Sequence, residues 1–310
     1  MRVAVIGLGT MGMGAALNLV RAGHEVHGAE LRAAVRAELV SAGGQAVGRA
    51  CDLPDGMDAA VVFVVNATQA EAVLFGQEGC LPRMAPGGVV LCCTTVAPET
   101  ARTLCARIES AGLLMLDAPV SGGAVAARGG SMTVMASGSE AAFARAQPVL
   151  DAIAGKLWRL GDEVGIGSTV KMVNQLLAGV HIATAAEAMA LGIRAGADPQ
   201  TLYDVISTSA GSSWMFQNRV PHILAGDDTP LSAVNIFVKD LGIVLDQARA
   251  LTFPLPMASA AHQLFLAAAA AGHGARDDAF VIRFWQTLAG IALPKKQEET
   301  PPTQPQPPSS

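Results

Sequence analysis

Glycines near the start of the chain are spaced as in a dinucleotide-binding motif. The segment Gly7-Leu8-Gly9-Thr10-Met11-Gly12 follows a short apolar run, and Glu30 lies about twenty residues further along. The first glycine would permit a sharp turn, the second would let a pyrophosphate approach the backbone, and the third would let a helix pack closely. The N–H groups at the start of that helix would bind the phosphates. Glu30, which is followed by Leu31, would meet the adenosine ribose.

The carboxylate of Glu30 also bears on the choice of cofactor. It would repel the 2′-phosphate of NADP, which favours NAD. Arg32 is a contrary signal because it could pair with that phosphate, although it could equally be an exposed residue that opens the next helix. An ordinary glycine-rich turn is the alternative to a nucleotide site, but it leaves the register of the glycines with Glu30 unexplained. The sequence therefore predicts NAD as the cofactor.

A lysine within an apolar stretch is the second candidate for chemistry. Lys171 lies near the start of a helical pattern that runs to Gly196, and Asn174 and Gln175 follow it by three and four residues on one face. The helix dipole and partial burial would both lower the pKa of this lysine toward neutrality. Such a lysine can act as a general base or acid. The alternative is a lysine whose ammonium group reaches water, and the spacing alone leaves both open.

A third candidate is the loop segment Ser121-Gly122-Gly123, which follows the predicted strand 113–117. Two glycines after a small hydroxyl residue expose successive backbone N–H groups, an arrangement that suits a substrate carboxylate. A tight turn that needs positive φ angles explains the glycines equally well.

These candidates belong to a chain in which strands and helices alternate through the first half. Short apolar runs at 2–6, 25–30, 59–65, 88–93, 113–117, 131–137 and 156–160 predict strands, with helical stretches between most of them. This order is typical of an α/β fold, a Rossmann-type doubly wound sheet over residues 1–162. Asn66 and Thr95 lie just after the ends of two of the strands, so we expect them to line the cofactor site. Helix capping is the alternative for both residues.

The second half predicts an all-helical domain over residues 163–294. Helical patterns extend over 166–196, 214–224, 235–251, 256–272 and 277–288, and Lys239 lies on the third of these segments. The first is apolar on nearly all sides, so other helices or a second subunit must cover it, which predicts a homodimer or homotetramer. Residues 295–310 are rich in Pro, Gln, Thr and Ser and predict a disordered tail.

Composition argues against several classes of protein. The formal net charge of −5 and the lack of a Lys/Arg cluster argue against a nucleic-acid partner. The five cysteines lack C-x-x-C spacing and the six histidines lack metal-ligand spacing, so we expect no metal. No apolar run looks long enough for a membrane span, and the first strand leaves no room for a signal peptide. We therefore expect a soluble, cytoplasmic protein without a membrane partner.

Taken together, the motifs resemble those of the β-hydroxyacid dehydrogenases, also called the 3-hydroxyisobutyrate dehydrogenase family. The resemblance spans nearly the whole chain up to the tail. It rests on four segments in the family's order: Gly7–Gly12, Asp117–Gly123, Gly165–Gln175 and Phe237–Leu241.

The resemblance implies a role for each candidate residue. Lys171 would be the catalytic acid/base, Ser121, Gly122 and Gly123 would hold the substrate carboxylate, and Asn174 would orient the substrate. Thr95 and Lys239 would contact the cofactor near its nicotinamide. Trp214 and Phe237 would either line the site or belong to the core.

Within the family, the segments 175–182, 213–219 and 253–256 look most like those of enzymes that oxidise L-threonate. The resemblance implies NAD-dependent oxidation of a small hydroxy acid, with L-threonate oxidised at C2 as the favoured reaction. Asn174 departs from the histidine expected in threonate enzymes and matches the wider family instead. Oxidation of 3-hydroxyisobutyrate and reduction of tartronate semialdehyde are therefore alternatives.

Two further readings are open. An imine reductase shares the architecture but has another residue at the lysine position, so Lys171 argues against it. A non-catalytic NAD-binding regulator would have little need for a buried lysine beside a carboxylate site.

Overall fold

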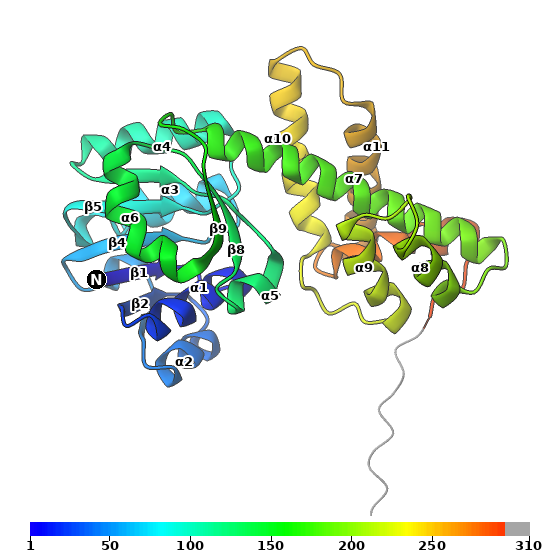
Figure 1. The fold of residues 1–310 in the computed structure, drawn as a ribbon, viewed down its shortest axis with the longest axis horizontal. Coiled ribbons are helices and arrows are strands. Elements are labelled where there is room, and N and C mark those ends of the chain that lie inside the picture. Colours follow the sequence, from blue (N-terminus) through cyan, green and yellow to red (C-terminus); the bar gives the residue numbers. More distant parts are fainter. Residues whose placement is uncertain (295–310) are drawn as a thin grey trace, which may run out of the picture. The chain divides into compact units, whose positions relative to one another are not determined.

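The computed structural model describes residues 1–294 and contains two compact units (Figure 1). The first unit comprises Met1–Leu177 and Ile236–Ser259, and the second comprises Ala178–Asn235 and the described residues from Ala260 to 294. The predicted tail, 295–310, lies outside the described residues. The predicted boundary at residue 162 falls between the last strand, which ends at Arg159, and a helix that begins at Ile166.

The first unit is built on a six-stranded parallel sheet with the order β3-β2-β1-β4-β5-β6. The strand order reverses between β1 and β4, and ligands bind at such a point, beyond the carboxyl ends of the strands. The predicted Rossmann-type doubly wound fold is confirmed. The strands are β1 Arg2–Ile6, β2 Glu25–Ala29, β3 Gln45–Val47, β4 Met57–Val62, β5 Met84–Cys92 and β6 Leu114–Asp117.

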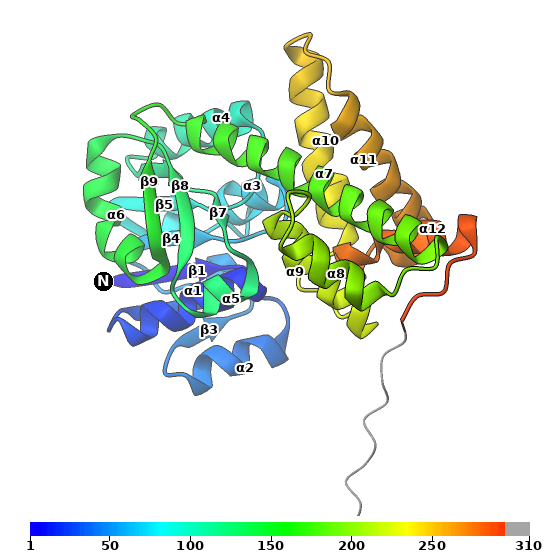
Figure 2. The ribbon, with the colours of Figure 1, turned by 45° about the vertical axis from the view of Figure 1, so that its right-hand side comes forward.

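Both faces of this sheet are covered by helices, as the figures show (Figures 1 and 2). Alternate residues of a strand point to opposite faces, so Val3 and Val5 belong to one core cluster and Ala4 and Ile6 to the other. Burial on both faces explains why the strands are continuously apolar. Helices α1 Thr10–Arg21, α2 Ala33–Ser41 and α6 Glu140–Ile153 supply the first cluster, and α3 Ala67–Phe75 and α4 Pro98–Ser110 supply the second.

A second, three-stranded sheet follows, with the order β7-β8-β9. Strand β7 Val120–Ser121 pairs antiparallel with β8 Met132–Ala136, which pairs parallel with β9 Ala154–Arg159. A short helix, α5 Gly123–Arg128, lies between β7 and β8. The sequence predicts strands at the positions of β8 and β9, but β7 is too short to leave a pattern.

Some predicted elements differ from the observed ones in length or in type. The predicted strand 59–65 stops at Val62 because the chain leaves the sheet after Phe63, whose N–H bonds the carbonyl of Ile6 at 2.8 Å. The predicted helix 256–272 is α11 Pro256–Ala268 followed by the irregular turn Ala269–His273, in which Gly272 has φ of 87°. The predicted helix 277–288 consists of a 3₁₀ segment, Asp278–Ile282, and α12 Arg283–Ala289.

The remaining elements complete the list. Two 3₁₀ turns in the first unit span Ala50–Asp52 and Leu81–Arg83, and the other helices are α7 Ile166–Arg194, α8 Pro199–Ser207, α9 Trp214–Ala225 and α10 Val234–Ala250.

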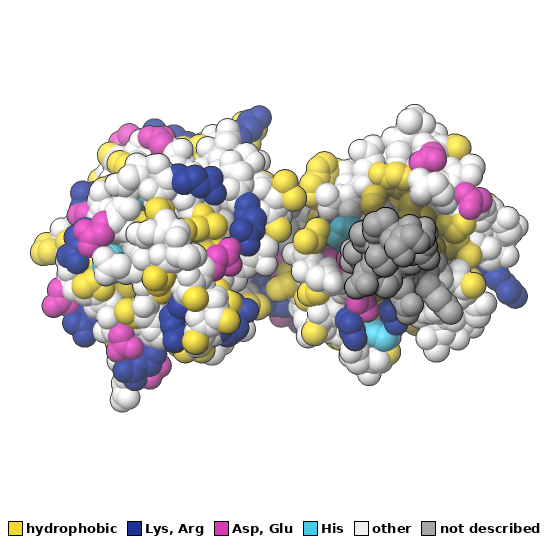
Figure 3. All heavy atoms as spheres, turned by 90° about the horizontal axis from the view of Figure 1, so that it is seen from below, with side chains coloured by type: hydrophobic (Ala, Val, Ile, Leu, Met, Phe, Trp, Pro, Cys, Tyr) yellow, Lys and Arg dark blue, Asp and Glu magenta, His cyan; other side chains and the backbone are white. Residues whose placement is uncertain are grey.

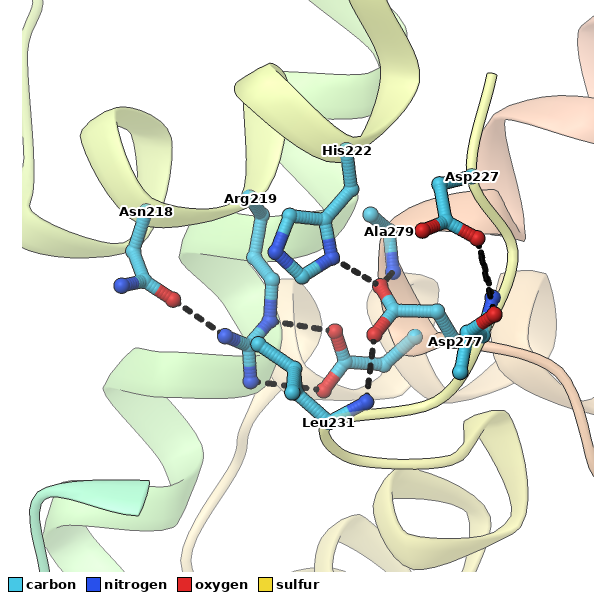
Figure 4. Close-up of polar contacts among 9 residues, drawn as sticks. Asn218, Arg219, His222, Asp227, Leu231, Asp277 and Ala279 are labelled. Carbon is cyan, nitrogen blue, oxygen red and sulfur yellow. Dashed lines mark hydrogen bonds and ion pairs between the residues drawn. The ribbon is translucent and has the colours of Figure 1, made fainter. Parts of the chain in front are cut away.

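The second unit contains a buried polar cluster that joins α9 to the chain around Asp277 (Figure 4). Arg219 of α9 forms a two-point ion pair with Asp278, with N···O distances of 2.5 and 3.2 Å. Asp277 lies 3.2 Å from the imidazole of His222 and accepts backbone N–H bonds from Leu231 and Ala279. Asp277 thus caps the 3₁₀ segment that begins at Asp278.

One described helix, α7, is long and apolar enough to cross a membrane by length and composition alone. The expectation that no apolar run reaches that length was therefore wrong. Part of this helix is buried within the protein, and the core helix of a soluble protein meets the same criteria. On the face shown in Figure 3, basic side chains over the α/β unit are interspersed with acidic and hydrophobic ones.

Candidate active site

The glycine loop after β1 is shaped by close backbone contacts. Gly7 has φ of 87°, and a Cβ on this residue would lie 2.5 Å from the carbonyl oxygen of Phe63. A Cβ on Gly12 would lie 1.9 Å from the carbonyl oxygen of Gly7. Packing therefore requires glycine at both positions. A Cβ on Gly9 would meet no atom within 4 Å, so its lack of a side chain leaves free surface beside the loop.

The start of α1 provides a fit for the cofactor diphosphate. Gly9 is the N-cap residue, and no side chain in residues 1–294 caps this helix. The first N–H groups of α1, beginning at Thr10 and Met11, therefore remain available to an anion, with the positive end of the helix dipole behind them. An uncapped helix start next to an open glycine is what a bound pyrophosphate needs.

Glu30 directly follows β2 and is held in place by four hydrogen bonds. Its carboxylate accepts from the N–H of Leu8 at 3.1 Å and from the N–H of Arg32 at 3.1 Å. The guanidinium of Arg32 adds bonds of 2.8 and 3.1 Å to the two oxygens, and these bonds lower the pKa of Glu30. Arg32 is thus paired with the carboxylate of Glu30, while Leu31 is 79% exposed between them.

The two polar residues expected at strand ends behave differently. Asn66 caps α3, because its side-chain oxygen accepts the N–H of Gln69 at 2.9 Å. The capping alternative is therefore correct for Asn66. Helix α4 has Ala97 as its N-cap, without a side-chain cap, so the same alternative is wrong for Thr95. The carbonyl oxygen of Thr95 instead accepts a hydrogen bond from Nζ of Lys239 at 3.4 Å.

Lys171 is buried on the second turn of α7, with 7% of its surface exposed. The alternative of a lysine whose ammonium reaches water is therefore wrong. Its Nζ donates to Oε1 of Gln175 at 2.8 Å, and Nδ2 of Asn174 donates to the same oxygen at 3.1 Å. Burial lowers the pKa of Lys171 to about 8, with Asp240 opposing and Lys239 reinforcing the shift.

Gln175 connects Lys171 to α10. Its Nε2 donates to Oδ2 of Asp240 at 2.5 Å, and the other oxygen of Asp240 forms an ion pair with Lys239. The sequence does not predict Gln175 and Asp240 as site residues. In the sequence, Gln175 is only a glutamine in an apolar stretch and Asp240 is only an aspartate next to Lys239. Neither feature reveals that the two side chains are hydrogen-bonded to each other.

The start of α7 is fixed by Asp117 at the end of β6. This buried carboxylate accepts the N–H groups of Gly165 and Ser168 at 3.1 and 2.7 Å and the hydroxyl of Ser168 at 2.7 Å. Burial outweighs these hydrogen bonds and raises the pKa of Asp117. Asp117 thereby holds the helix one turn before Lys171.

The predicted carboxylate-binding segment lies at the junction of β7 and α5. Ser121 ends β7, and Gly122 and Gly123 have φ angles of 122° and 66°. These angles favour glycine, so a turn requirement explains the residue types without reference to a ligand. Asn18 of α1 donates to the carbonyl oxygen of Ala127 at 2.7 Å, which fixes α5 against the glycine-loop helix.

Phe237 and Trp214, which were expected either to line the site or to belong to the core, differ in burial. Phe237 is buried on α10 with 2% of its surface exposed, and Trp214 is 60% exposed at the start of α9. Within residues 1–294, no group of three His, Cys, Asp or Glu side chains could hold a metal ion.

Family models match both halves of the chain. Residues 2–161 match the model described as the NAD binding domain of 6-phosphogluconate dehydrogenase. Residues 165–285 match the model described as NAD-binding of NADP-dependent 3-hydroxyisobutyrate dehydrogenase.

Relatives of known name are similar over nearly the full length. L-threonate dehydrogenase of Cupriavidus necator is 56% identical over 296 residues, which cover 96% of this chain and 99% of the relative. 3-Hydroxyisobutyrate dehydrogenase of Pseudomonas aeruginosa is 34% identical over 270 residues, 85% of this chain and 90% of the relative. A crystal structure of 3-hydroxyisobutyrate dehydrogenase from Salmonella typhimurium has a TM-score of 0.88 and 52% identity, covering 92% of this chain and 99% of that one.

The Rossmann-type sheet, the open glycine loop and these matches define an NAD-binding oxidoreductase. The chain belongs to the 3-hydroxyisobutyrate dehydrogenase family. It is an NAD-dependent hydroxyacid dehydrogenase.

Proposed function

We propose that the enzyme oxidises L-threonate at C2 to the 2-oxo acid, with Lys171 as the acid/base. The substrate proposal is supported by five relatives named L-threonate dehydrogenase, which are 50–56% identical. The Salmonella protein, which is 52% identical, is named after 3-hydroxyisobutyrate instead. The substrate must therefore be assigned by experiment and not by sequence identity. The observation that carries the proposed mechanism is the buried Lys171 with its pKa of about 8.

The proton transfer follows from the environment of Lys171. A neutral amine accepts the proton of the substrate hydroxyl while bound NAD supplies the hydride-accepting chemistry. The ammonium group that forms would be costly to bury alone, but the carboxylate of Asp240 favours it. Its positive charge also stabilises the negative charge that develops on the substrate oxygen.

The other predicted residues would bind the cofactor and would bind and orient the substrate. The N–H groups of Gly122 and Gly123, with Ser121, would hold the substrate carboxylate, and Asn174 would orient the hydroxyl beside Lys171. The start of α1, over Gly7-Leu8-Gly9-Thr10-Met11-Gly12, would hold the cofactor diphosphate. Glu30 with Leu31 would bind the adenosine ribose, and Asn66, Thr95 and Lys239 would complete the cofactor site.

A panel of acids tests the substrate. Formation of NADH or NADPH is followed with L-threonate, D-threonate, D-erythronate, D-glycerate and 3-hydroxyisobutyrate, and tartronate semialdehyde is tested in the reducing direction. A preference for L-threonate with NAD supports the proposal, and a preference for another acid redirects it within the family. NAD binding without turnover on any of these compounds would instead favour the regulator.

Replacement of the lysine tests the mechanism. Lys171→Met keeps an apolar side chain of similar length but removes the base, so we expect turnover to fall by at least about a hundredfold. NAD binding, measured by calorimetry, should remain as in the wild type because Lys171 is not in the glycine loop. Near-normal turnover would remove Lys171 from the mechanism.

We also propose that the enzyme works in the cytoplasm as a homodimer or homotetramer. The support is a stripe of exposed apolar side chains on the first three turns of α7, at Ile166, Val170, Val173 and Leu177. The proposal involves no nucleic-acid or membrane partner.

A further inference from the structure

A continuous chain of polar side chains runs through the apolar interior of the first unit. It connects Lys171, Gln175, Asp240 and Lys239 in that order, from α7 to α10. Gln175 and Asp240 are 8% and 2% exposed, so water contributes little to satisfying them. Buried polar groups are costly unless their hydrogen bonds are made, and this chain satisfies them internally.

We propose that Gln175 is a positioning residue for Lys171, and that Asp240 both fixes the orientation of its amide and supplies the negative charge that favours the ammonium form of the lysine. The inference rests on the proposed role of Lys171 as acid/base. Gln175 is not assigned to contact substrate or cofactor; it acts through the lysine.

The orientation of the Gln175 amide follows from the donors and acceptors around it. The ionised carboxylate of Asp240 can only accept hydrogen bonds, so it requires the NH₂ group of Gln175 on its side. Oε1 must then face Lys171 and Asn174, which both donate to it. A flipped amide would place its NH₂ against these donors and its oxygen against a carboxylate. Only one orientation is therefore compatible with all three neighbours.

This fixed acceptor has a consequence for the neutral lysine. An uncharged amine has two N–H bonds and one lone pair, and the hydrogen bond to Gln175 commits one N–H bond. The lone pair, which must receive the substrate proton, then points away from Gln175. Without this acceptor, the amino group could rotate about its terminal bond and the lone pair would lose its direction.

The same chain sets the electrostatic environment of Lys171. The charged groups that act on it are both on α10: Asp240, which raises its pKa, and Lys239, which lowers it. On its own helix the neighbours are the neutral amides Asn174 and Gln175, while Asp117 lies at the helix start and binds Gly165 and Ser168. Because Lys239 pairs with Asp240, the carboxylate reverses only part of the lowering of the Lys171 pKa that burial causes.

Two substitutions in the full-length enzyme separate positioning from a merely structural role. Gln175→Met keeps the length of the side chain but removes the strong acceptor. We expect kcat to fall about tenfold or more with KM nearly unchanged, as for loss of an orienting contact. Asp240→Asn removes the negative charge, so the acidic limb of the kcat/KM profile should move to lower pH by about one unit.

A matched pair of controls exists on α6. Gln147 donates to Asp151, four residues on, at 2.6 Å, and both side chains are exposed. Gln147→Met and Asp151→Asn repeat the same chemical changes away from Lys171. We expect neither control to alter kcat or the pH profile.

The outcomes are distinct. The proposal is overturned if Gln175→Met keeps wild-type kcat, or if Asp240→Asn leaves the pH profile unchanged, while Lys171→Met is inactive. If Gln175→Met does not fold, as judged by thermal unfolding and NAD binding, the pH profile of Asp240→Asn decides alone. If Lys171→Met is active, or if the wild-type enzyme oxidises no hydroxy acid, the proposed function itself is wrong, and the positioning role of Gln175 is overturned with it.

Discussion

In the mechanism we propose, burial makes a base of Lys171, a residue type that is normally protonated. An exposed lysine would be an ammonium ion at neutral pH, but removal from water disfavours the charged form. The resulting pKa of about 8 lies close to working pH, where a proton acceptor is most effective.

The first prediction concerns the pH dependence of oxidation. Only the neutral amine can accept the hydroxyl proton, so kcat/KM for oxidation should fall as the pH drops below about 8. The reverse reaction needs the ammonium form, and its rate should fall as the pH rises through the same range. Initial rates across pH in both directions measure this. If the rates of oxidation and reduction changed in the same direction with pH, a single acid/base group would not explain them.

Glu30 supports a prediction about cofactor choice. Glu30→Ser removes the charge that we expect to repel a 2′-phosphate, and it releases the guanidinium of Arg32 from its ion pair. A charge-assisted hydrogen bond is worth about 1.5–3 kcal/mol, so we expect the ratio of NADP to NAD efficiency to rise by about 10- to 100-fold. Steady-state kinetics with both cofactors measure the ratio. An unchanged ratio would mean that Glu30 does not select the cofactor.

For individual residues, the sequence predicts a candidate such as Lys171 better than it predicts the side chains that the candidate contacts. Lys171 stood out because a charged residue in an apolar helix needs a reason. Gln175 and Asp240 meet across 65 positions of the chain, and no local pattern reveals such a contact. Asn66 shows the converse problem, because a polar residue after a strand can cap the next helix, which leaves its predicted cofactor role untested.

Among the helices, α7 begins in a buried position. The N–H groups at its start are buried and need acceptors: Asp117 from β6 accepts those of Gly165 and Ser168, and Ser137 accepts that of Gly167. A strand of the sheet thus fixes the position of the helix that carries Lys171.

We therefore predict a stability difference between two substitutions of Asp117. Asp117→Ala leaves the buried N–H groups of Gly165 and Ser168 without their acceptor, at a cost of about 3 kcal/mol. Asp117→Asn retains one oxygen for these groups, and its NH₂ can donate to the hydroxyl of Ser168, so the loss should be less than half as large. Urea denaturation of the two variants and wild type measures both. Equal losses would show that the hydrogen bonds to this residue do not anchor the helix.

The predictability of each element depended on its length and its end signals. Helix α6 occupies the stretch between the predicted strands 131–137 and 156–160, and Ser139 caps its start. The two-residue strand β7 is too short for a periodic pattern, so the second sheet was not predicted. The apolar run that ends at Val65 extends beyond β4 because Phe63 and Val64 still pack against the two core clusters after the strand has ended at Val62.

For the whole molecule, the exposed stripe on α7 needs an explanation. Ile166, Val170, Val173 and Leu177 recur at intervals of four, three and four residues, so they lie along one side of the helix. Their exposed fractions run from 38% to 52%, in a contiguous row rather than singly. Such a row of apolar side chains on a protein surface marks an interaction site.

The last prediction is that this stripe joins copies of the chain. Wild-type enzyme should be a dimer or tetramer by light scattering at micromolar concentration in the absence of detergent. Val173→Glu with Leu177→Glu places two like charges in the stripe of each copy, so dissociation toward monomers should follow. Val40→Glu on α2 is the matched control, since Val40 is 53% exposed but lies outside the stripe, and its oligomeric state should not change. A wild-type monomer would exclude self-association, and sedimentation of the wild type with lipid vesicles would assign the same apolar helix to a membrane instead.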